Sequence, residues 1–448
     1  MNFEIYKPYY RRNLQLAIPV MITQAGQVIV QMADNIMVGH LGTAEFAGVS
    51  FTNVIFTIGI VFTICFTQGL TPLAGENYGK GNHLEVTKYL QNSFVLNFLI
   101  GIAITIIMVL IVPLMDYMGQ DKEILVYGKK YYWITLISIL PTAIFFTIRN
   151  FSESIGITKY AMYITVAANL LNVLLNWLLI YGKFGFPMLG VSGAAIATLI
   201  SRVIMLVSFL ILIFKLDIYK RFTKLISKPY IDKSKLYSLL TTSMPIALQG
   251  LVEVTAFGLT GIIVGWFGKE TLAANQIAVT MGTFSFMIAQ GIGVAGTIIV
   301  SHQFGQQNYK AMRDAGFASC HMSVVLMGFA GLLYVIFRKY IPYIFSTDPI
   351  VVEIASQLLI VSAAFQIFDA SQLSGLAILR GLKDVKKPLY YSIIAYYLIC
   401  LPLGYFLSFT LGIGAIGIWI GLLIGLAMAA LLYLLRFNIL TKRLIGNA

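Results

Sequence analysis

Residues 361–381 read VSAAFQIFDASQLSGLAILRG, an apolar stretch long enough for a membrane-spanning helix with one carboxylate near its middle. At helical spacing Ser362, Gln366 and Asp369 share one side, and apolar side chains cover the rest. A carboxylate at that depth costs roughly 2.5–3.5 kcal/mol on insertion scales, so it normally faces a polar interior. Asp369 is therefore a candidate functional residue. A structural ion pair or a protonated packing residue is the alternative.

The composition excludes a soluble protein. The 448-residue chain is 58% apolar and 11% charged, with a mean hydropathy of +0.84. We predict an all-α polytopic membrane protein with twelve transmembrane helices. The predicted spans are 14–37, 46–72, 91–115, 130–151, 160–181, 190–214, 239–264, 271–298, 316–337, 353–379, 388–410 and 413–435.

The net charge of +13 has an uneven distribution along the chain. Loops on the side of the N-terminus hold 23 of the 31 Lys and Arg residues, and the opposite side holds 7. This bias predicts that both termini are cytoplasmic, with some contact to anionic lipid and no nucleic-acid partner. Arg202 is the one basic residue well inside a predicted span. We expect it either to pair with an acid or to extend to the membrane surface.

The two halves of the chain repeat at an offset of 226 residues. This offset aligns the following pairs without a gap: Pro19 with Pro245, Gly39 with Gly265, Gly42 with Gly268, Ala47 with Ala273, Gly79 with Gly305 and Asn82 with Asn308. Since each half has an even number of spans, we predict two six-helix bundles in a parallel, pseudo-two-fold repeat. The predicted parts are an N-terminal lobe (1–214), a basic cytoplasmic linker (215–238) and a C-terminal lobe (239–448).

Polar stripes follow two spans of the first half. The first span carries Gln24, Gln27, Gln31 and Asp34 at steps of three, four and three, and the fifth carries Asn169, Asn172 and Asn176. We expect the stripes to face a water-filled cavity or each other. A carboxylate with amide carbonyls suits a proton or a small alkali cation. Amide bonding that only holds the bundle together is the alternative.

The seventh span has a polar face of its own, formed by Gln249, Glu253 and Thr260. Whether Glu253 adjoins Asp369 is not determined by the sequence. Glu253 could also be a structural partner for a buried donor. We expect the glutamines of these polar faces to line a substrate cavity, namely Gln24, Gln27, Gln31, Gln249 and Gln366.

Enzymatic chemistry is not supported by the motifs. The sequence has no metal-ligand pair of histidines and no Walker-type glycine loop, and its three cysteines are widely spaced in apolar segments. We therefore predict no enzyme activity and no cofactor, and an ion gradient as the energy source.

Several motifs resemble those of the multidrug and toxic compound extrusion (MATE) transporters, especially their bacterial NorM-like branch. They are MADNIMVGHLG (32–42), LNVLLN (171–176), YGKFGFP (181–187), QIFD (366–369), LRGLKD (379–384) and PLG (402–404). The resemblance spans nearly the whole chain in order.

The resemblance implies a V-shaped pair of six-helix lobes that exchanges Na⁺ or H⁺ for organic, often cationic, drugs. It makes Asp34, Asn172 and Asn176 candidates for a first-lobe cation or proton site, and Glu253 and Asp369 candidates for a second-lobe site that suits Na⁺. It also implies a monomer in the bacterial inner membrane, in contact with membrane lipids. A flippase for lipid-linked oligosaccharides or lipids, from the same wider superfamily, is the alternative.

Overall fold

A computed structural model describes residues 3–226 and 230–447. Lys228 and Pro229 of the predicted linker lie outside the described residues. The helices are α1 (Phe3–Gly39), α2 (Thr43–Thr67), α3 (Leu70–Gly79), α4 (His83–Ile111), α5 (Lys122–Ile137), α6 (Ile139–Ser154), α7 (Lys159–Tyr181), α8 (Val191–Lys215), α9 (Asp217–Thr223), α10 (Lys233–Gly265), α11 (Lys269–Gly305), α12 (Tyr309–Phe337), α13 (Pro349–Gly381), α14 (Lys386–Ile393), α15 (Leu401–Tyr405) and α16 (Ala415–Gly446). Short 3₁₀ helices occupy Val112–Tyr117, Lys183–Gly185 and Ile341–Ile344, and π-helical segments occupy Ile394–Cys400 and Phe406–Thr410.

Twelve helical segments of the described chain are long and apolar enough to cross a membrane, which confirms the predicted all-α fold. Two of these spans are interrupted, between α2 and α3 and between α5 and α6. In each case a proline follows the break, Pro72 or Pro141. Proline cannot donate to the carbonyl four residues earlier, which weakens the helix at that point. The surrounding packing decides the outcome, because α1 and α10 continue through Pro19 and Pro245.

The internal repeat extends to the helix caps. Asn82 precedes α4 and its side chain accepts the backbone N–H of Glu85, with a donor–acceptor distance of 3.1 Å. Asn308 precedes α12 and accepts the N–H of Ala311 at the same distance. The two caps have nearly identical backbone angles, with φ of −88° and −89°. The aligned asparagines therefore perform the same local function in both halves.

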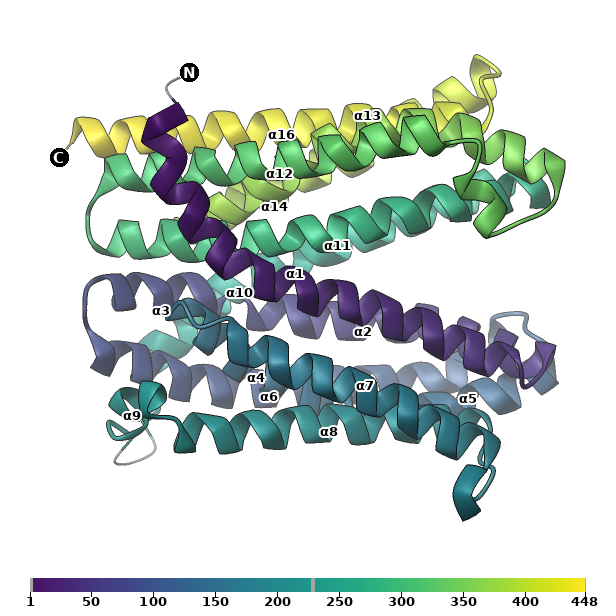
Figure 1. The fold of residues 1–448 in the computed structure, drawn as a ribbon, viewed down its shortest axis with the longest axis horizontal. Helices are drawn as coiled ribbons and strands as arrows, with labels where there is room; N and C mark the ends of the chain where they lie inside the picture. Colours follow the sequence, from purple (N-terminus) through teal and green to yellow (C-terminus); the bar gives the residue numbers. More distant parts are fainter. Residues whose placement is uncertain (1–2, 227–229, 448) are drawn as a thin grey trace. The chain divides into compact units, whose positions relative to one another are not determined.

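The contacts divide the chain into two compact units. One unit combines the chain up to Gln24 with the chain from Leu248 onward, and the other is Ala25–Ala247. Helices α1 and α10 thus each contribute to both units. In the first unit α13 packs against α11, α12 and α16, which run side by side (Figure 1). In the second unit α2 packs on α5, α4 on α6, and α7 on α8.

A close helix crossing supports the second unit. A Cβ on Gly48 of α2 would lie 2.7 Å from the carbonyl oxygen of Ile124, and a Cβ on Gly128 of α5 would lie 2.8 Å from the carbonyl oxygen of Gly48. Glycine at both positions lets the two backbones touch. Asn53, five residues after Gly48, and Tyr131, three residues after Gly128, both line a pocket in this unit.

Candidate functional site

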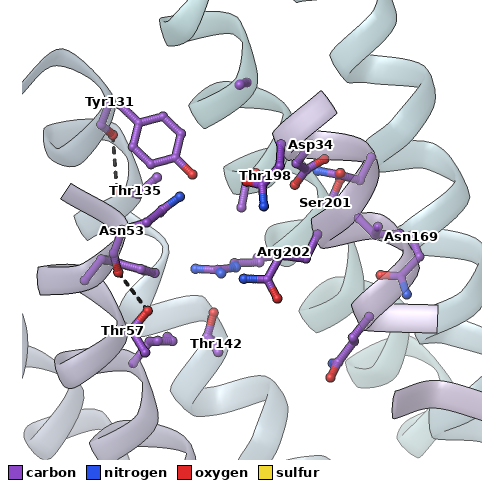
Figure 2. Close-up of a pocket in the computed structure, with 18 of the residues that line it drawn as sticks. Asp34, Asn53, Thr57, Tyr131, Thr135, Thr142, Asn169, Thr198, Ser201 and Arg202 are labelled. Carbon is purple, nitrogen blue, oxygen red and sulfur yellow. Dashed lines mark hydrogen bonds between the residues drawn. The ribbon is translucent and has the colours of Figure 1, made fainter. Parts of the chain in front are cut away.

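A pocket of about 340 Å³ lies within the unit Ala25–Ala247 (Figure 2). This volume is at the lower end of the range for small-molecule sites. Side chains from α1, α2, α5, α6, α7 and α8 enclose it. Its polar lining includes Gln27, Gln31, Asp34, Asn35, Asn53, Thr57, Thr135, Thr142, Asn169, Asn172, Thr198, Ser201 and Arg202, and its aromatic lining comprises Phe56, Tyr131, Phe145 and Phe146.

Asp34 is joined to the asparagine stripe of α7. The amide nitrogen of Asn176 donates to Asp34 Oδ1 and also approaches Asn172 Oδ1 at 3.2 Å. Asn176 is fully buried, and its own carbonyl oxygen has no hydrogen-bond partner among the described residues. The polar stripes of α1 and α7 therefore meet. Together they present a carboxylate and amide carbonyls, the hard oxygen donors that a small cation binds.

The glutamines of α1 lie in two different environments, one on each side of the boundary between the units. Gln27 and Gln31 line the pocket beside Asp34. Gln24, which belongs to the other unit, donates from its amide to Gln290 Oε1 of α11. A single helical face therefore serves two environments, because α1 changes its packing partners after Gln24.

A second acidic cluster lies in the unit that begins at Leu248. Glu253 of α10 and Asp369 of α13 belong to the same unit, and their charges repel each other. Asp369 is only 3% exposed. Arg380 interacts electrostatically with Glu253. Tyr396, from the π-helical segment, interacts electrostatically with both acids, and its buried hydroxyl has no hydrogen-bond partner in the described chain.

The two remaining predicted glutamines are buried in this same unit. Gln249 accepts a hydrogen bond of 2.8 Å from Arg380 Nη2. Gln366 accepts one of 2.7 Å from the hydroxyl of Ser285. Their side chains are 3% and 0% exposed, so both hold helices together in this structure.

Sequence reasoning identified Arg202 as a basic residue within a span but not its role. The structure places Arg202 in the pocket lining, where it interacts electrostatically with Asp34. The pocket residues of α2 and α5, such as Asn53 and Tyr131, carry no distinctive sequence pattern, since isolated polar or aromatic residues are common in membrane helices.

Both halves of the chain match one known protein family. The MatE family model matches residues 19–178 and 245–406, so it covers both halves of the chain. The chain is 31% identical to the multidrug resistance protein NorM of Vibrio vulnificus (strain CMCP6), over 98% of this chain and 97% of the relative. It is 29% identical to the multidrug resistance protein MdtK of Yersinia pseudotuberculosis, over 97% and 96%.

Solved structures share the fold. A structure described as an outward-facing conformation of a multidrug resistance MATE family transporter superposes with a TM-score of 0.90 at 21% identity, covering 98% of this chain and 97% of that one. The eukaryotic MATE transporter AtDTX14 superposes with a TM-score of 0.87 at 19% identity, covering 99% of both chains.

Proposed function

Because this chain belongs to the MatE family of membrane transporters, we propose that it is a secondary active antiporter that exports organic cations in exchange for Na⁺ or H⁺. Family membership confirms the resemblance found in the sequence, and with it the prediction that the chain is not an enzyme. The relatives at about 30% identity are named for multidrug resistance, which supports drugs as the exported compounds.

The observation that carries this proposal is the carboxylate of Asp34 in a pocket lined largely by amides, hydroxyls and aromatic rings. A carboxylate attracts a cation, and aromatic faces bind flat or cationic compounds. Phe56, Phe145 and Phe146 supply such faces in the same pocket as Asp34. Few directional contacts are fixed in advance, which suits a transporter of several related compounds.

The second acidic cluster is our candidate for the coupling-ion site. Two carboxylates that repel each other, one of them buried, do not readily both carry a negative charge, so binding of a proton or Na⁺ there is favoured. Glu253 and Asp369 supply carboxylate oxygens, and the hydroxyl of Tyr396, which interacts electrostatically with both, has no hydrogen-bond partner among the described residues. Such oxygen donors fit Na⁺, which we favour over H⁺.

Coupling follows from reciprocal linkage in this proposal. If ion and drug each stabilise a different conformation, binding of one lowers the affinity for the other. Exchange of one Na⁺ for one monovalent drug moves no net charge, so the Na⁺ concentration ratio alone drives it. A tenfold ratio stores about 1.4 kcal/mol and supports at best a tenfold drug gradient.

We further propose that the protein works as a monomer in the inner membrane of a bacterium, with both termini in the cytoplasm. The uneven distribution of Lys and Arg supports this orientation. The same basic loops would contact anionic lipid headgroups.

Dye transport in proteoliposomes tests the proposal. Purified protein is reconstituted, Na⁺ and H⁺ gradients are imposed one at a time, and movement of a fluorescent organic cation is followed. We expect movement with one gradient and its loss when Asp34, Glu253 or Asp369 is replaced by the matching amide. Absence of dye movement with either gradient, together with translocation of a labelled lipid-linked oligosaccharide, would establish the flippase instead.

A further inference from the structure

Arg202 of α8 presents an incompletely bonded guanidinium to the pocket. Its Nη1 donates to the hydroxyl of Ser138 at 2.6 Å, and the group lies over the ring of Phe56, 5.4 Å from the ring centroid. Among the described residues Ser138 is the one hydrogen-bond acceptor that Arg202 reaches. Figure 2 shows the side chain extending into the pocket toward the wall that carries Asn53 and Tyr131.

The unused donors of Arg202 define what the group can bind. A guanidinium has five N–H donors in a planar fork, which matches the two oxygens of a carboxylate. Arg202 is partly buried and lines the pocket, and within the described chain its other nitrogen atoms make no hydrogen bond. The position of the guanidinium over the Phe56 ring adds a cation–π contact that helps to hold the group in the pocket. A guanidinium in this position can bind an anionic group.

Asp34 and Arg202 line the same pocket but remain separate charges. They interact electrostatically, yet no direct ion pair joins them within the described chain. Asp34 is instead bonded to Asn176, and Arg202 to Ser138. The pocket therefore offers one anionic and one cationic group at different positions, with aromatic rings on its walls.

We propose that Arg202 determines specificity by binding the carboxylate of amphoteric aromatic substrates, whose ammonium or amidinium group binds at Asp34. This inference rests on the proposed export function and narrows its substrate class. A simple organic cation engages Asp34 alone and meets repulsion from Arg202. A compound with both charges satisfies both groups, so the wild-type pocket prefers it.

A matched pair of dyes tests this inference: a cationic xanthene dye with a free benzoate, and its methyl ester. The ester lacks the negative charge and differs otherwise by one methyl group. Transport of both is measured in proteoliposomes with the gradient that drives the wild type. We expect wild type to move the acid with the higher kcat/KM. R202Q should lose about tenfold or more for the acid, as expected for a hydrogen bond to a charged group, and should move the ester at least as well as wild type.

Two further variants separate recognition from structure. R202K keeps the charge without the fork, so it should retain a smaller preference for the acid over the ester. R313Q makes the same change as R202Q in the other unit, where Arg313 contacts Asn438, and should leave the acid-to-ester ratio unchanged. Ester transport by R202Q shows that this variant is folded. If R202Q does not accumulate in the membrane, the ratio in R202K decides.

The outcomes distinguish the two proposals. An equal effect of R202Q on both dyes would overturn the role of Arg202 in recognition and would leave the export function intact. An acid-to-ester ratio in R202K equal to that of wild type would also contradict recognition by the guanidinium fork. Failure of wild type to move either dye with either gradient would overturn the proposed function itself.

Discussion

Replacement of Asp34 by asparagine removes the charge of the pocket carboxylate with little change in its shape. The amide of Asn176 donates to Asp34 Oδ1 in the wild type and can also donate, in a weaker bond, to the side-chain carbonyl oxygen of the D34N variant. The contact between α1 and α7 should therefore survive, and the variant should fold and accumulate normally. What it loses is the charge that we propose attracts the substrate.

The magnitude follows from the kind of bond lost. A hydrogen bond that involves a charged group contributes about 1.5–3 kcal/mol. Loss of such a bond to an organic cation corresponds to a roughly 10- to 150-fold rise in Kd. Gradient-driven transport at dye concentrations below Kd should fall by the same factor.

Equilibrium binding of a fluorescent cation to purified D34N gives the Kd, and proteoliposome transport gives the rate. D116N provides the matched control, since Asp116 is half-exposed, pairs with Lys129 and lies outside the pocket lining. The control should bind and transport like wild type. A D34N variant with wild-type Kd and wild-type transport would refute the assignment of Asp34 to cation binding.

Three further predictions concern coupling and stability. E253Q and D369N should each abolish ion-driven efflux in proteoliposomes while accumulating normally; full coupled transport in either variant would remove the second cluster as the ion site. G128A would place a Cβ 2.8 Å from the carbonyl oxygen of Gly48, so we expect about 1–3 kcal/mol of destabilisation and a lower unfolding temperature in detergent. G328A is the control, because a Cβ at position 328 would have open space around it, and it should show no such loss. Asp232, outside the spans, accepts the backbone N–H of Ser234 at 2.8 Å, and this bond holds the pKa of Asp232 below its ordinary value. Its stabilisation should be full at neutral pH and fade as the pH falls through that lowered pKa. Thermal melts of wild type should show this acid-dependent loss more strongly than melts of D232N.

The periodic features of the sequence predicted the fold well. The lengths of the apolar segments predicted the number of spans. The matching Pro, Gly and Asn residues at helix ends and turns predicted the repeat. Both features depend on local properties of the chain. The MatE model matches twice, and the starts of its two matches, Pro19 and Pro245, are separated by the same 226 residues. Helix ends were less predictable, since polar turns such as the beginning of α1 continue a helix beyond the apolar run.

Long-range contacts could not be predicted in the same way. Gln24 and Gln27 share one face of α1, yet Gln24 contacts Gln290 and Gln27 lines the pocket. Periodicity describes a face of one helix, not the neighbour it meets. The proximity of Glu253 and Asp369, and the separation of Arg202 from Asp34, depend on the packing and rotation of different helices.

The charged residues of the two units differ, and the difference suits substrate binding in one unit and ion binding in the other. The pocket in Ala25–Ala247 combines one acid, one arginine and aromatic rings, which suits an organic compound. The cluster in the other unit combines two neighbouring acids, which suits a small cation. Under our proposal, coupling then requires elements that belong to both units. Helix α1 carries Asp34 after its transition at Gln24, and helix α10 carries Glu253 after its transition at Ala247. A shift of α10 caused by binding at Glu253 would therefore also move the part of α10 that belongs to Ala25–Ala247. In the same way, a shift of α1 caused by binding at Asp34 would move the part of α1 that belongs to the unit with Glu253 and Asp369.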